Sequence, residues 1–96
     1  MSKLDDALKR FEQVATLGMR ESDYKQVDDS LAWFREDLAV VKNALSKKDE
    51  LLKQYKSFFG KTIKFMLSDS DERNHHEALL EIAKLEKEIE EELRND

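Results

Sequence analysis

Apolar residues recur along this chain at intervals of three and four, the spacing that places side chains on one face of an α-helix. The first such stripe begins after Ser2, a residue type that caps helix starts, and ends before Gly18, a residue type that favours helix ends. Its members are Leu4, Leu8, Phe11 and Ala15. The pattern predicts a first helix over about residues 2–17.

A much longer stripe follows Ser22 and Asp23, which are suited to start a helix. Its register continues through Tyr24, Val27, Leu31, Phe34, Leu38, Val41, Leu45, Leu52, Tyr55, Phe59 and Met66. A sustained repeat of this kind is typical of helices that pack along a coiled-coil-like seam. We therefore predict one central helix over about residues 23–66, roughly 64 Å long.

A break near Ser46 is the alternative. The segment from Ser46 to Asp49 also resembles a helix start, and Asn43 is suited to end a helix. A break there would give a compact four-helix bundle. The unbroken helix is the favoured prediction because residues 43–49 contain neither glycine nor proline and the apolar register survives the gap.

The last helix is expected over about residues 70–94, after the cap-forming segment Ser68–Asp71. Its stripe comprises Ala78, Ile82, Leu85 and Ile89, with Leu79 and Leu93 alongside. The sequence thus predicts a single all-α domain, residues 1–96, with three helices and a long central one.

Composition supports helices and excludes several classes of protein. The 96 residues include no proline, no cysteine and only two glycines. Disulfides and cysteine-ligated metals are therefore excluded. The N-terminal residues lack the apolar run of a signal peptide, and no stretch has the roughly 18 apolar residues of a membrane span, so we expect a cytoplasmic protein.

Charge is unevenly distributed along the chain. Residues 42–64 carry seven lysines against two acidic residues, whereas residues 65–96 carry four basic and eleven acidic ones. We expect the lysines to face the acidic last helix. The alternative is that the basic aromatic stretch 53–66 lies on an anionic membrane surface. Nucleic acid is not an expected partner, because this stretch has no arginine and the whole chain has a net charge of −5.

No motif indicates catalysis, so we predict a protein that is not an enzyme and has no catalytic, cofactor-binding or metal site. His75 and His76 point about 100° apart on a helix and therefore do not chelate one metal ion together. The pair His76–Glu77 resembles the histidine–acid pair at which sensor kinases accept phosphate. A phosphotransfer accessory acting through His76 is accordingly a distant alternative.

The favoured function is a non-enzymatic helical module for protein–protein interaction or oligomerisation, of the adaptor, chaperone or regulator type. A long central helix has a wider apolar band than its own neighbours would cover, which predicts an elongated homodimer, another protein partner, or both. The predicted interface residues are Trp33, Phe34, Leu38, Val41, Leu51, Tyr55, Phe58, Phe59 and Phe65.

Overall fold

Helical backbone dominates the structure, which confirms the all-helical prediction. The computed structural model describes residues 2–47, 49–70 and 73–94; 83% of them are helical and none lies in a strand. The described α-helices are α1 (Lys3–Leu17), α2 (Ser30–Leu45), α3 (Glu50–Gln54), α4 (Lys56–Ser68) and α5 (His76–Arg94). Two 3₁₀ turns, Met19–Glu21 and Asp23–Gln26, connect α1 to α2.

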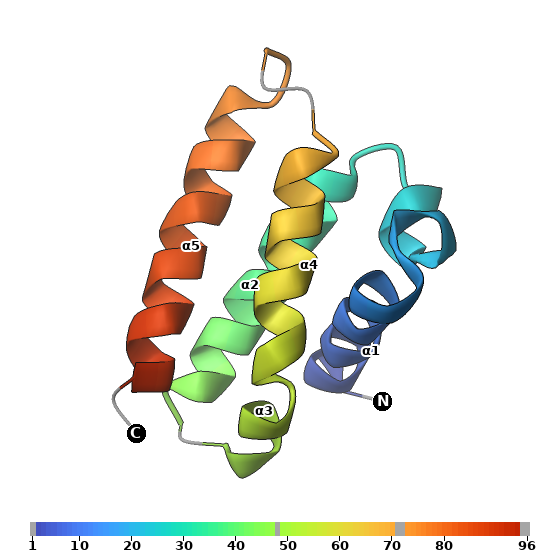
Figure 1. Ribbon diagram of the computed structural model, residues 1–96. Coiled ribbons are helices and arrows are strands. Elements are labelled where there is room, and N and C mark those ends of the chain that lie inside the picture. The colour runs from blue at the N-terminus through green and yellow to red at the C-terminus, as the bar shows by residue number, and fades with distance from the viewer. Residues whose placement is uncertain (1, 48, 71–72, 95–96) are drawn as a thin grey trace.

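The longer helices run alternately up and down (Figure 1). In that view α4 stands in front between α5 and α1, and α2 lies behind. The principal extents are 36 × 25 × 20 Å. Helix α5 packs most extensively on α2, whereas α1 packs on both α2 and α4.

The prediction of an unbroken helix over 23–66 is wrong. Helix α2 ends at Leu45, and the break falls near Ser46, where the alternative placed it. Ser46 donates its hydroxyl to the carbonyl of Asn43, and Asp49 is extended with its carboxylate accepting the amide of Leu51. These local bonds compete with helical ones, which explains the break without glycine or proline. Folding back lets the apolar stripes on both sides of the break face one core.

Two predicted helix starts are also wrong. Ser22 caps a 3₁₀ turn through the amide of Tyr24, and α2 begins later, with Asp29 as its cap. At the other site, Ser68 and Ser70 donate their hydroxyls to carbonyls of α4 and so close that helix instead of opening the next. Helix α5 starts at His76, not near residue 70. The predicted cap residue Asp71 and the chain end after Arg94 lie outside the described residues.

The first helix is confirmed at both ends. The Ser2 hydroxyl accepts the amide of Asp5 at 3.1 Å. Gly18 ends α1 with φ 84° and ψ 178°, a conformation that essentially only glycine adopts. Its amide donates to the carbonyls of Gln13 and Val14.

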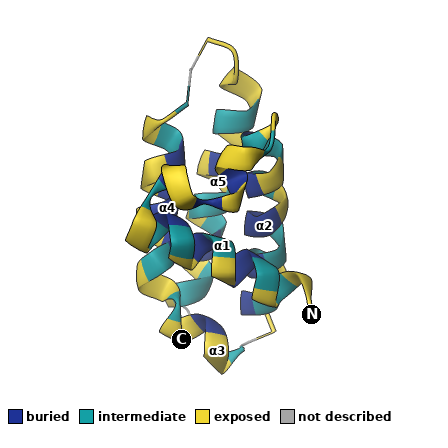
Figure 2. Cartoon of the chain, turned by 90° about the vertical axis from the view of Figure 1, so that its right-hand side faces the viewer, coloured by how far each residue is buried: buried dark blue, intermediate teal, exposed yellow. Residues whose placement is uncertain are grey.

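The core lies where α1, α2, α4 and α5 meet, and Figure 2 shows buried positions on the inward faces of the helices. Phe11 stands at the centre, edge-on to both Phe34 and Phe59, with ring centroids 5.8 and 5.6 Å apart. Tyr24 adds a third edge-to-face contact, at 5.4 Å from Phe34. Such geometry adds to the stabilisation from area burial alone. A buried hydrogen bond from the Thr62 hydroxyl to the Phe11 carbonyl, at 2.8 Å, joins α4 to α1.

Candidate interaction surface

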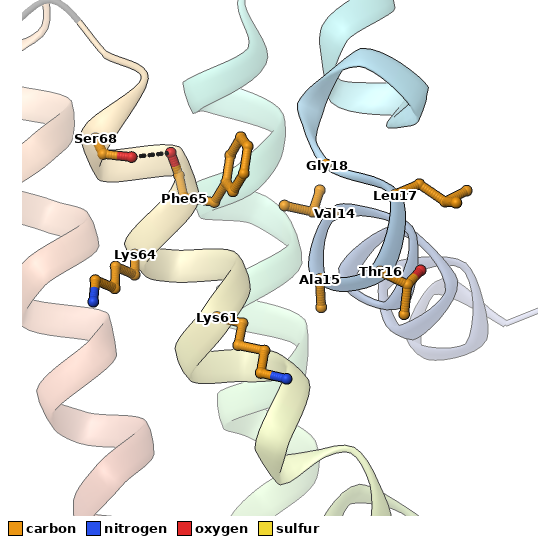
Figure 3. Close-up of a pocket in the computed structure, with 9 residues that line it drawn as sticks. All are labelled: Val14, Ala15, Thr16, Leu17, Gly18, Lys61, Lys64, Phe65 and Ser68. Carbon is orange, nitrogen blue, oxygen red and sulfur yellow. Dashed lines mark hydrogen bonds between the residues drawn. The ribbon is translucent and has the colours of Figure 1, made fainter.

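An open groove of about 580 Å³ runs between the end of α1 and the outer side of α4 (Figure 3). Helix α1 and its C-terminal glycine form one wall, and two turns of α4 form the other. The lining residues are Val14, Ala15, Thr16, Leu17, Gly18, Lys61, Lys64, Phe65 and Ser68.

Gly18 shapes the floor of this groove. A Cβ atom added at this position would lie 3.6 Å from the ring of Phe65. In Figure 3 the Phe65 ring points across the gap toward Gly18 and Val14. This distance is an ordinary van der Waals contact, so Gly18 is required for its backbone conformation and not to leave space for the ring.

Large apolar side chains remain exposed at the groove. Phe65 is 42% exposed and Leu17 is 61% exposed. Leu17 points away from α4, so the apolar surface extends around the end of α1 (Figure 3). Single exposed apolar residues are ordinary, but an exposed aromatic ring in a concave setting, continued by an exposed leucine around the rim, is typical of binding surfaces.

The groove is positively charged. Helix α4 carries Lys56, Lys61 and Lys64 and no acidic residue. Among the described residues, no acidic side chain forms an ion pair with these lysines. Asp69, the acidic residue that follows α4, lies 3.7 Å from Lys25.

The expected pairing of lysines with the last helix is therefore only partial. Lys42 on α2 forms an ion pair with Glu88 on α5 at 2.8 Å, and Arg35 pairs with Glu81 between the same two helices. In contrast, Lys61 extends toward α1, and Lys64 extends toward the α5 side without an ion pair to a described residue (Figure 3).

The nine predicted interface residues are not brought together. Phe34, Leu38, Val41 and Phe59 are fully or almost fully buried in the chain's own core. Tyr55 and Phe58 are half-buried, with ring centroids 5.8 Å apart. The exposed members lie on three different helices, Trp33 on α2, Leu51 on α3 and Phe65 on α4. Only Phe65 lines the groove.

A buried polar cluster was missed at the sequence level. Asp37 lies on the inward face of α2 and accepts both Nε and Nη2 of Arg10, at 2.6 and 2.8 Å, as well as the hydroxyl of Tyr24. The Arg10 guanidinium also lies 5.9 Å from the ring centroid of Trp33. The sequence feature that could have indicated this cluster is Asp37 itself, a carboxylate within an apolar helical stripe, three residues after Phe34 and next to Leu38.

The surroundings of this cluster favour a structural role. Burial, with a further contribution from the Asp37 carboxylate, raises the pKa of the Tyr24 hydroxyl. The hydrogen bonds to Asp37 raise the pKa of the Arg10 guanidinium. Both carboxylate oxygens of Asp37 are engaged by these partners, so the cluster joins α1, α2 and the connecting turn instead of presenting a free base.

His75 and His76 lie at the start of α5 and are both exposed. The carbonyl of His75 accepts the amide of Leu79 at 2.9 Å, as expected for a residue at a helix start. Within residues 2–47, 49–70 and 73–94, no three histidine, cysteine or acidic side chains are grouped so that they could hold a metal ion.

The basic aromatic stretch 53–66 directs most of its apolar side chains inward. Phe59, Ile63 and Met66 are buried, and Phe65 is the large apolar residue of α4 that stays exposed. In the part of the chain that the structure describes, no helix has both the length and the apolar character needed to cross a membrane.

No protein-family model matches the chain, and no curated protein or solved structure is significantly similar to it.

Proposed function

We propose that this protein is a non-enzymatic protein–protein interaction module, built as a four-helix bundle that presents the groove between α1 and α4 to a partner. The observation that carries the proposal is the half-exposed Phe65 ring, which points toward Gly18 across the groove, with Leu17 exposed around the end of α1. Aromatic residues at the centre of a concave, partly apolar surface contribute strongly to binding in protein interfaces.

The rest of the fold supports this assignment. The seam residues and the polar cluster around Asp37 serve the chain's own core, whereas Phe65 and Leu17 remain exposed at the groove. The bundle is a rigid support for such a surface, because both walls of the groove are helices joined by the Thr62–Phe11 hydrogen bond.

The test is affinity capture from a lysate of the source organism, with the wild-type protein compared with Leu17→Glu and Leu80→Glu. The two leucines are a matched pair, because they are 61% and 60% exposed and Leu80 lies on α5, outside the groove. We expect Leu17→Glu to abolish capture of specific partners and Leu80→Glu to leave it intact. Equal retention of every captured protein by both variants would contradict the proposal.

Peripheral membrane binding through residues 53–66 is the competing function, and one observation favours it: exposed lysines beside Phe65 on α4. Co-sedimentation with anionic vesicles decides between the two. Salt-sensitive vesicle binding that is lost in Lys61→Glu, together with no protein partner, would replace the interaction proposal.

A further inference from the structure

Helix α4 presents an exposed aromatic ring, Phe65, and two exposed lysines, Lys61 and Lys64, on one side. Lys61, Lys64, Phe65 and Ser68 are spaced at three, four and seven residues, so they form one stripe along two turns of the helix. The stripe spans roughly 10 Å, as the helical rise per residue requires. It faces solvent along the groove, and the Phe65 ring points toward Gly18.

The charge of this stripe is not balanced locally. The nine residues that line the groove include two lysines and no acidic side chain. This holds although the whole chain has a net charge of −5. The groove is therefore a basic, partly apolar surface on an acidic protein. Its positive charge favours partners that carry negative charge.

We infer that the occupant of the α1–α4 groove is an acidic amphipathic helix of a partner protein. This inference rests on the proposed function and adds the chemistry of the partner. Carboxylates on the partner pair with Lys61, which extends across the groove toward α1, and with Lys64 on the α5 side of α4. Apolar side chains of the partner contact Phe65 and, around the end of α1, Leu17. The lysines set charge selectivity, and the apolar contacts supply most of the affinity.

A helical partner fits this surface better than an extended one. The described backbone of both walls is helical, so neither wall presents the free strand edge to which an extended peptide would add. Recognition must then come from side chains that project from a helix face at three- and four-residue spacing, which matches the spacing of the α4 stripe.

The test measures fluorescence anisotropy of two labelled helical peptides. Both carry leucines on one face; in one peptide the flanking positions are glutamates, and in the other they are lysines. We expect the glutamate peptide to bind the full-length protein more tightly, with an affinity that falls as salt rises. Lys61→Glu combined with Lys64→Glu should weaken this binding by about tenfold or more, and Phe65→Ala should weaken it as well.

The matched control is Lys84→Glu combined with Lys87→Glu. These lysines are exposed, have the same three-residue spacing and lie on α5. We expect this pair to leave the peptide affinity within about twofold of wild type, because net charge alone acts weakly at this range in salt. Circular dichroism of every variant confirms that the helical fold is retained.

Several results would overturn the inference. They are equal binding of the lysine peptide, no binding of either peptide, an equal loss in the α5 control pair, or binding of anionic vesicles through Lys61 and Lys64 in place of the peptide. If the glutamate peptide fails but Leu17→Glu still abolishes capture of natural partners, the partner chemistry is wrong and the proposed function stands. If Leu17→Glu has no effect on capture either, both fail.

Discussion

Arg10 and Asp37 form a two-pronged ion pair between α1 and α2, with Nε 2.6 Å from one carboxylate oxygen and Nη2 2.8 Å from the other. The Arg10 and Asp37 side chains are 16% and 7% exposed, so water screens the pair weakly. Tyr24 donates a further hydrogen bond to the same carboxylate. One acidic side chain therefore joins three segments of the fold.

We expect Asp37→Asn to lower the free energy of unfolding by roughly 3 kcal/mol, because the Arg10 charge would lose its counterion while remaining largely buried. The control is Glu81→Gln, which removes the partner of Arg35 in a more exposed ion pair between α2 and α5. Its effect should stay below about 1 kcal/mol. Urea denaturation measures both, and equal effects would show that the buried pair has no special role.

Stability should also fall at alkaline pH because of Tyr24. Burial raises the pKa of its hydroxyl above the ordinary value of 10.0. Above pH 10 the unfolded chain therefore loses the Tyr24 proton while the folded chain retains it, which stabilises the unfolded state. The contribution of the protonated Tyr24 hydroxyl to the free energy of unfolding is fully present below pH 10. Above pH 10 the free energy of unfolding falls by about 1.4 kcal/mol per pH unit.

Tyr24→Phe is the variant that isolates this effect. It should lower stability at neutral pH, because Asp37 loses one hydrogen bond, and should show a shallower decline above pH 10 than the wild type. Chemical denaturation across this pH range gives both slopes. Parallel slopes for the two proteins would indicate that Tyr24 ionises as readily in the folded state as in the unfolded state.

The two glycines should respond in opposite directions to alanine. Gly60 lies inside α4, and a Cβ atom there would have no neighbour within 4 Å, so Gly60→Ala should stabilise the protein by about 1 kcal/mol. Gly18 has φ 84° and ψ 178°, so Gly18→Ala should destabilise it by about 1–3 kcal/mol. Thermal unfolding of both variants tests the pair. Destabilisation by Gly60→Ala would contradict the open space around the added Cβ atom at this position.

Helical periodicity was sufficient to predict the helical class and the first helix, because the stripe from Leu4 to Ala15 is bounded by an effective cap and a glycine. It failed at Ser46, where a register that continues across a turn looks the same as an unbroken helix. It also failed at Ser68 and Ser70, because a serine hydroxyl can bond either backward or forward along the chain.

The candidate site was less predictable than the fold. Phe65 was among the predicted interface residues, but Leu17 and Gly18 were seen only as the end of a helix. The groove depends on how α1 approaches α4, and the 38 residues 18–55 separate these two helices in the sequence. The Arg10–Asp37 pair depends on the same kind of distant contact, and local spacing carries no information about it.

Leu38 is one of the residues that the sequence predicted at a protein interface, as part of an expected homodimer. An elongated homodimer was expected because a helix of roughly 64 Å would leave an apolar band uncovered. The longest extent of the chain is only 36 Å, and Leu38 is fully buried within it. The chain's own helices cover the seam residues Phe34, Leu38, Val41 and Phe59, whereas Trp33, Leu51 and Phe65 stay exposed on three different helices.

Leu38→Glu should therefore unfold the protein, not merely separate two copies, since an unpaired carboxylate in the core costs several kcal/mol against a typical total stability of about 5–15 kcal/mol. Leu80→Glu, at a position that is 60% exposed, should leave the fold intact. Circular dichroism reports folding, and light scattering with small-angle X-ray scattering reports mass and shape. A folded Leu38→Glu monomer derived from a wild-type particle of twice the chain mass would show instead that Leu38 lies at an interface between copies. A folded wild-type chain with a radius of gyration near 12.5 Å would support the compact arrangement and leave the groove free for a different partner.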